Sequence, residues 1–156
     1  MRKILLGLVA AAAIATPLAV AGTANAASAR APAKATGNVA WTVDLSYADL
    51  GTVTGTTTFS ANDKTGGTLD YTNSLGSYLH GTVTPGTVVK SGNTIKFRGV
   101  ITDASAVYNG GTGYFVGVVK DVSTSGANGD EIAVFVNEEP HDNIHADVTS
   151  GNLTVF

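Results

Sequence analysis

The run IKFRGVIT, residues 95–102, alternates between two faces along the chain. Ile95, Phe97 and Ile101 fall on one face, and polar side chains such as that of Lys96 fall on the other. This alternation is typical of a β-strand with one face in a hydrophobic core and the other in solvent. The run therefore predicts a half-buried strand, and the rest of the chain repeats its pattern.

Similar segments, rich in Val, Thr, Ile, Phe and Tyr, lie on both sides of this run. Gly, Asn, Asp and Ser cluster between the segments and predict turns. No segment after the N-terminal region keeps an apolar period of about 3.6 residues, so we expect no long helix there. The predicted strands lie at residues 39–46, 52–60, 69–72, 78–84, 95–102, 114–120, 131–137 and 152–156.

About eight strands joined by short connections predict an all-β fold, either a sandwich or a closed barrel. We favour an antiparallel β-sandwich of about eight strands, with a closed β-barrel as the alternative. Gly81, Gly99 and Gly117 fall inside predicted strands. A glycine at such a position indicates a bulge or the close approach of neighbouring backbone.

Residues 1–26 have the three parts of a secretory signal peptide. Arg2 and Lys3 give a positive start, and residues 4–15 form an apolar run. The triplet Ala24-Asn25-Ala26 then has small residues at the two positions that signal peptidase reads. These features predict export of the chain.

We expect cleavage after Ala26, with cleavage after Ala29 as the alternative, and secretion of the remainder. Residues 27–37 are small, weakly basic and contain a proline, which predicts a flexible lead-in. Residues 38–156 then form a single all-β domain of ordinary size. The chain has no cysteine, so no disulfide and no lipid-modified cysteine is expected. Without the signal peptide we expect no membrane contact.

The chain is acidic, and its charge is unevenly distributed. It has 9 Lys and Arg against 12 Asp and Glu, and loss of Arg2 and Lys3 would make it more acidic. After Lys120 no Lys or Arg follows, whereas seven Asp and Glu residues do. Because no basic patch is present to bind phosphates, we expect no nucleic acid as a partner. The acidic part favours cations or basic surfaces as partners, or serves only to keep a secreted protein soluble.

Several short motifs lie between residues 66 and 153. They are GGTLDY (66–71), LHGTVT (79–84), SGNTIKFRG (91–99), GTGYFVGVVKD (111–121), GANGDEIAVFV (126–136) and SGNL (150–153). Together they resemble a family of small all-β accessory domains of secreted bacterial proteins. The resemblance implies a secreted β-rich domain with no catalytic activity, no established ligand and no assigned functional residue.

His141 and His145 lie in an acidic segment, residues 138–147 (EEPHDNIHAD). Imidazole and carboxylate groups are ligands of Zn²⁺, and a loop can bring both histidines, with His80 as a third, onto one ion. In an extended chain the two histidines would lie about 13 Å apart, too far to share an ion. The segment therefore predicts either a zinc site or a polar surface loop broken by Pro140.

A second candidate metal site lies in residues 121–131 (DVSTSGANGDE). Asp121, Asp130 and Glu131 supply carboxylates, and Ca²⁺ takes about six to eight oxygen ligands. The segment lacks the residue order of a helix-loop-helix calcium site, and its Gly and Asn residues also suit a long hairpin loop. It predicts either a calcium site or a plain hairpin loop.

Catalysis has little support in the sequence, which has no cysteine nucleophile and no G-x-S-x-G motif. Trp41, together with tyrosines such as Tyr71 and Tyr108, can form a platform on which a sugar ring stacks. Trp41 alternates with Val39 and Val43, however, which predicts that its side chain is buried in the core.

We therefore expect a secreted, non-catalytic accessory or interaction module whose partner is an extracellular protein or glycan. No cofactor is expected unless Ca²⁺ or Zn²⁺ binds at the segments above. Two alternatives are a small secreted hydrolase that uses a metal or carboxylates near His141 and His145, and a secreted enzyme inhibitor. The inhibitor would present an exposed loop such as residues 123–129 on a rigid domain.

Overall fold

The computed structural model describes residues 31–122, 129–140 and 145–156, and residues 31–156 form one compact unit. The strands are β1 (Lys34–Asp44), β2 (Thr52–Asn62), β3 (Gly66–Asn73), β4 (Tyr78–Val83), β5 (Val89–Ser91), β6 (Thr94–Ala104), β7 (Tyr114–Lys120), β8 (Glu131–Val136) and β9 (Ala146–Val155). Two short 3-10 turns, η1 (Ser46–Ala48) and η2 (Ala106–Gly111), complete the elements. None of the described helical turns is long and apolar enough to cross a membrane.

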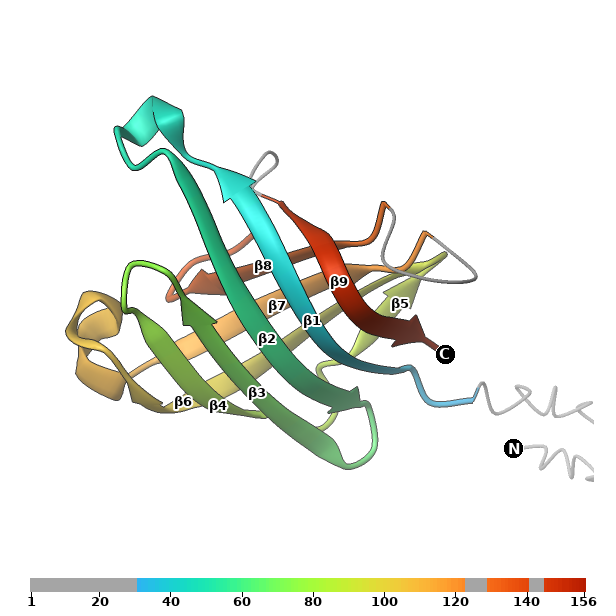
Figure 1. The fold of residues 1–156 in the computed structure, drawn as a ribbon. Coiled ribbons are helices and arrows are strands. Elements are labelled where there is room, and N and C mark those ends of the chain that lie inside the picture. Colours follow the sequence, from blue (N-terminus) through green and yellow to red (C-terminus); the bar gives the residue numbers. More distant parts are fainter. Residues whose placement is uncertain (1–30, 123–128, 141–144) are drawn as a thin grey trace, which may run out of the picture. The chain divides into compact units, whose positions relative to one another are not determined.

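The strands form one antiparallel sheet that closes on itself (Figure 1). Neighbours around the ring follow the order β1-β2-β3-β4-β6-β7-β8-β9, and β9 pairs again with β1. β5 lies outside the ring, where it pairs only with the start of β6. The described part of the chain is an up-and-down β-barrel, and the all-β prediction is confirmed.

The β-sandwich that we favoured from the sequence is wrong, and the closed barrel is correct. The pairing of β4 with β6 decides this, because it joins the sheet into a ring. β6 is long enough to pair with β5 through its first residues and with β4 from Gly99 onward. Closure pairs edge N–H and C=O groups that an open sheet would leave exposed. Side chains alternate in the same way in both architectures, so the alternation could not distinguish them.

The predicted alternation itself is confirmed in β1 and β6. Ile95, Phe97 and Ile101 are buried inside the barrel, and Lys96 is exposed on its outer face. In β1, Trp41 is buried in the core, as its alternation with two valines predicted.

Phenylalanine rings fill the middle of the barrel. Phe97 lies edge-on to Phe115 with ring centroids 6.3 Å apart, and Phe59 stacks on Phe97 at 5.7 Å. Gly99 faces the ring of Phe115 and Gly117 faces the ring of Phe97, so closely that a Cβ at either position would collide with the ring. Close approach of neighbouring backbone is confirmed at Gly99, beside the carbonyl oxygen of Thr82, whereas at Gly117 the close neighbour is the Phe97 ring. At both positions the missing side chain makes room for a ring.

A second, smaller apolar cluster covers the outer face of β7 and β8. Val116, Ala133 and Phe135 are buried there, with Tyr114 and Val118 packed against them. This cluster explains why both faces of these two strands are apolar in the sequence.

The chain that leaves β8 lies over the same outer side of the barrel. Lys96 donates a hydrogen bond from its Nζ to Oε2 of Glu139 at 3.1 Å, and Arg98 forms an ion pair with the same carboxylate. Both cations belong to the outward face of β6. Glu139 thus ties the chain after β8 to β6 across the outer cluster.

The barrel begins earlier than the sequence predicted. Residues 27–37 were expected to be a flexible lead-in, yet β1 starts at Lys34, which pairs with Asn62 of β2. Ala35 is fully buried, and Gly37 faces the ring of Phe59. Ala35 and Gly37, two of the small residues that suggested flexibility, face the crowded interior. The predicted signal peptide and both cleavage positions lie outside the described residues.

The two ends of the barrel differ, as Figure 1 shows. We call the end at which β1, β3 and β6 finish the pocket end, and η1, the β3–β4 turn and η2 lie there. We call the opposite end, with the β2–β3 and β5–β6 turns, the far end.

Candidate functional site: a cavity at the pocket end of the barrel

The barrel wall is weakest between β8 and β9. Among the described residues these strands pair only at Glu131 with Asp147 and at Ile132 with Ala146, whereas β1 and β2 pair along their whole length. β1 likewise continues past Thr42 without a β9 partner in the described residues. A cavity of about 360 Å³ lies beside this gap.

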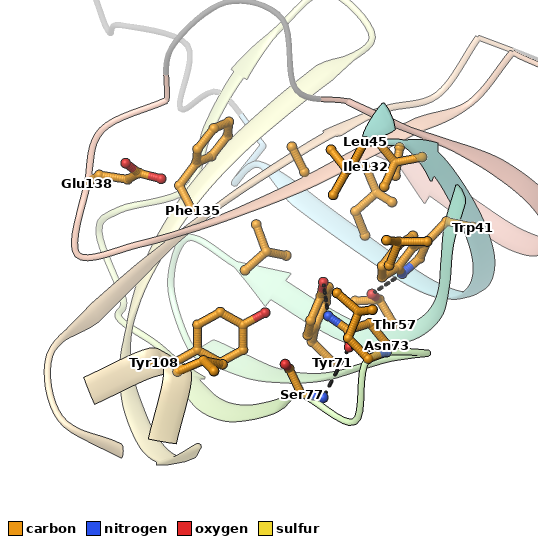
Figure 2. A pocket seen from close by; sticks show the side chains of 17 residues that line it. Trp41, Leu45, Thr57, Tyr71, Asn73, Ser77, Tyr108, Ile132, Phe135 and Glu138 are labelled. Atoms are coloured by element: carbon orange, nitrogen blue, oxygen red, sulfur yellow. Dashed lines mark hydrogen bonds between the residues drawn. The ribbon is translucent and has the colours of Figure 1, made fainter. Parts of the chain in front are cut away.

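Most side chains that line the cavity are apolar or aromatic, and they come from both sides of the gap (Figure 2). A largely apolar wall with a few polar groups is typical of small-molecule sites, which often lie in the mouths of β-barrels. The lining residues are Trp41, Val43, Leu45, Val53, Thr57, Tyr71, Asn73, Leu75, Ser77, Val107, Tyr108, Ile132, Ala133, Val134, Phe135, Glu138 and Ala146.

Three aromatic rings form one wall of the cavity. Trp41 stacks on Tyr71 with ring centroids 5.3 Å apart, and Tyr108 meets Tyr71 edge-on at 6.3 Å. Trp41 donates a hydrogen bond from Nε1 to Oγ1 of Thr57 at 2.9 Å. This bond explains why a fully buried threonine faces the inside of the barrel, because a buried indole N–H needs an acceptor.

Asn73, at the end of β3, links the aromatic wall to the β3–β4 turn. Its Oδ1 accepts backbone N–H bonds from Leu75 at 3.0 Å and Ser77 at 3.1 Å, which holds the turn. Its Nδ2 donates to the hydroxyl of Tyr71 at 3.2 Å. One amide side chain therefore fixes both the turn and the position of a ring in the cavity.

The Tyr108 hydroxyl lies in the polar part of this wall. Burial raises the pKa of Tyr108 well above its ordinary value of 10.0, and the neighbouring Tyr71 raises it further. Hydrogen bonds with Ser77 and Asn73 lower the pKa by smaller amounts. The phenol therefore stays neutral at ordinary pH and forms a polar cluster with Tyr71, Ser77 and Asn73.

The rim of the cavity is apolar and open to solvent. Leu75 in the β3–β4 turn is 53% exposed, and Val107 in η2 is 70% exposed. Glu138 brings a carboxylate to the lining, and Figure 2 shows it with Phe135 on the opposite side of the cavity from Trp41. The arrangement can hold a small apolar molecule between an aromatic wall and a carboxylate.

Two of the carboxylates predicted as calcium ligands make hydrogen bonds with the backbone. Asp130 is buried, and its Oδ1 accepts a hydrogen bond from the backbone N–H of Val122 at 2.9 Å. Oδ2 of Asp121 accepts one from the backbone N–H of Val155 at 3.2 Å. These bonds give both aspartates a structural role at the start and end of the β7–β8 connection.

The other predicted ligands lie apart from the cavity or outside the described residues. Glu131 pairs with Lys120 at 2.9 Å, and Nδ1 of His145 lies 4.0 Å from Oε2 of Glu131. His80 lies on the outer face, where its Nδ1 is 2.6 Å from Oδ1 of Asp70. Within the described parts of the chain, no three His, Asp or Glu side chains are placed to hold one metal ion.

The remaining sequence-based candidates fall outside what the structure describes. His141 lies in residues 141–144, and most of the predicted inhibitory loop lies in residues 123–128, and neither stretch is described. The predicted metal and inhibitor sites therefore stay predictions.

Sequence reasoning identified the aromatic residues without finding the cavity. Trp41 and Tyr71 were considered as a surface platform for a sugar, but both face the inside of the barrel. Asn73 and Ser77 were not singled out at all. Their turn-forming sequence was visible, but their position beside Tyr108 depends on η2, which lies about thirty residues further along the chain.

Comparison with known proteins finds no matching family model, no matching curated protein and no matching solved structure.

Proposed function

We propose that this chain is an exported, non-catalytic binding protein whose barrel takes up a small, largely apolar molecule. The observation that carries the proposal is the apolar cavity of about 360 Å³ with its exposed rim. An apolar cavity of about 150 Å³ holds one benzene, so this cavity suits a molecule of roughly two rings. Residues 1–26, with the pattern of a signal peptide, support export.

The chemistry of the lining supports binding rather than catalysis. The described lining residues include no histidine, lysine or arginine, and Glu138 is their one carboxylate. Ser77 is the only serine among them and has no histidine beside it in this lining to act as a base. Thr57 and Asn73 are engaged in bonds that hold Trp41 and Tyr71. These polar groups position the wall and orient a ligand.

The single tryptophan offers a direct test, because Trp41 lines the cavity. We expect naphthalenemethanol, a neutral two-ring alcohol, to change the fluorescence of Trp41 in the purified protein in a saturable manner. Isothermal calorimetry should give one site per chain with a negative heat-capacity change, which marks the burial of apolar surface.

Filling the cavity with a larger side chain tests the proposal, and the same substitution on the outer face of the barrel is the matched control. Val43 lines the cavity, whereas Val100 is 55% exposed on the outer face of β6. Val43→Phe should weaken binding at least about tenfold, a loss of about 1.4 kcal/mol, and Val100→Phe should leave it unchanged. A protein that binds no neutral two-ring compound, or binds it equally well after Val43→Phe, would contradict the proposal.

A further inference from the structure

We infer that the ligand of this cavity is a cation: an ammonium group carried on an apolar or aromatic body. The inference rests on the proposed function and adds the charge of the ligand to it. Three independent features of the described residues support it: where the chain places its cations, where it places its carboxylates, and which rings face the cavity.

The described lysines and arginines all lie away from the cavity. Lys34, Lys64, Lys90 and Lys120 belong to strands or turns at the far end, and Lys96 and Arg98 are on the outer face of β6. None of them lines the cavity. A carboxylate or phosphate ligand would therefore enter a desolvating site with no lysine or arginine among the described lining residues to pair with, which is costly.

Carboxylates lie at both ends of the barrel: Asp63, Asp121, Asp130 and Glu131 share the far end with the lysines, whereas those at the pocket end have no described lysine or arginine beside them. Glu138 lines the cavity itself. Asp44 at the end of β1, Asp49 in the β1–β2 connection and Asp103 near the end of β6 belong to the same end of the barrel. Hydrogen bonds from the side chain and backbone of Ser46 hold the pKa of Asp44 below its ordinary value, so this group stays ionised. Such a distribution attracts a cation toward the opening.

The aromatic wall adds a second attraction. The faces of Trp and Tyr rings carry partial negative charge and attract ammonium groups, most strongly where water is excluded. Elsewhere the chain's own cations use this contact, since Lys34 lies 5.1 Å from the Phe156 ring centroid and Arg98 lies 4.5 Å from that of Tyr114. At the cavity, Trp41 and Tyr71 have no lysine or arginine among the lining residues. A ligand ammonium group inside the cavity can fill this role, and Glu138 is the carboxylate of the same lining.

The test compares three probes with the same two-ring body: naphthalenemethylamine as the cation, naphthalenemethanol as the neutral form and naphthoate as the anion. Fluorescence of Trp41 and calorimetry report each affinity at neutral pH and low salt. We expect the amine to bind at least about fivefold more tightly than the alcohol, the size of a cation–π contact with an ion pair. We expect naphthoate to bind more weakly than the alcohol.

Glu138 and its neighbour Glu139 form a matched pair of variants. Glu138→Gln should reduce the preference for the amine over the alcohol to about twofold or less, while the affinity for the alcohol changes little. Glu139→Gln alters the adjacent carboxylate, which pairs with Lys96 and Arg98 on the outer face. This control should keep the full preference for the amine.

The outcomes separate this inference from the proposed function. If the alcohol binds but the amine binds no better, or naphthoate binds best, the cavity binds apolar ligands and the inference of a cation is wrong. An amine preference that survives Glu138→Gln overturns the role of Glu138 and, with it, the inference as stated. If none of the three probes binds, the proposed function fails as well.

Discussion

Tyr108 joins the chemistry of the cavity to the stability of the barrel. Its raised pKa means that the folded protein holds the phenolic proton above pH 10.0, where the unfolded chain releases it. By linkage, the free energy of unfolding then falls as the pH rises from about 10 toward the raised value. Below pH 10.0 both states are protonated, and this contribution is fully present.

We therefore expect a late phenol titration in the ultraviolet absorbance of the folded protein that Tyr108→Phe removes. The free energy of unfolding, measured by urea denaturation, should also fall less between about pH 10 and 12 in Tyr108→Phe than in the unmodified protein. Tyr78→Phe, on the face opposite to the core, serves as the control and should keep the late step. A late step that persists in Tyr108→Phe would show that another tyrosine carries it.

The element that most affects function is the short β8–β9 pairing. One of its contacts is the hydrogen bond from the backbone N–H of Val148 to the carbonyl of Asp130, at 3.0 Å. In the described part of the chain only two residue pairs join β8 to β9, whereas β1 and β2 are held along eleven residue pairs. Regions with few contacts open locally at lower free energy than the rest of a fold. The wall between β8 and β9 is therefore expected to open locally more readily than the β1–β2 ladder.

Hydrogen exchange measured by NMR tests this expectation. The amide of Val148 should exchange through local opening, faster than the amides in the β1–β2 ladder, and saturating naphthalenemethanol should slow it. Exchange of Val148 at the rate of the β1–β2 amides, unchanged by the ligand, would show that the wall does not open here.

At the scale of the whole molecule, the prediction concerns whether a bound Ca²⁺ or Zn²⁺ ion adds to the stability of this barrel, which has no disulfide. Asp121 and Asp130 accept backbone hydrogen bonds, and Glu131 pairs with Lys120, so each of these carboxylates has a structural contact. We expect the melting temperature of the protein to be the same with EDTA, Ca²⁺ or Zn²⁺.

The opposite result would be equally clear. An ion at about 100 times its dissociation constant stabilises a folded protein by about 2.7 kcal/mol. A rise of several degrees with Ca²⁺ that EDTA reverses and Asp130→Asn abolishes would establish the calcium site. A rise with Zn²⁺ that is lost in His141→Ala and weakened below about pH 6, as imidazole protonates, would establish the zinc site.

The chain's local chemistry was readable from the sequence because it repeats over short distances. Alternation in residues 95–102 predicted which side chains of β6 face the core. Gly99 and Gly117 indicated close approach, although the groups that approach include phenylalanine rings as well as backbone. Each of these properties depends on a strand's own period and on which residues lack a side chain.

Tertiary structure decided the rest, because it depends on pairings between distant segments. Alternation is the same in a sandwich and a barrel, and only the pairing of β4 with β6 closes the ring. The cavity likewise needs Trp41 of β1, Asn73 after β3, Tyr108 of η2 and Glu138 after β8 to meet at one end. No local pattern encodes that meeting, since it follows from the strand order and from how far β8 and β9 overlap.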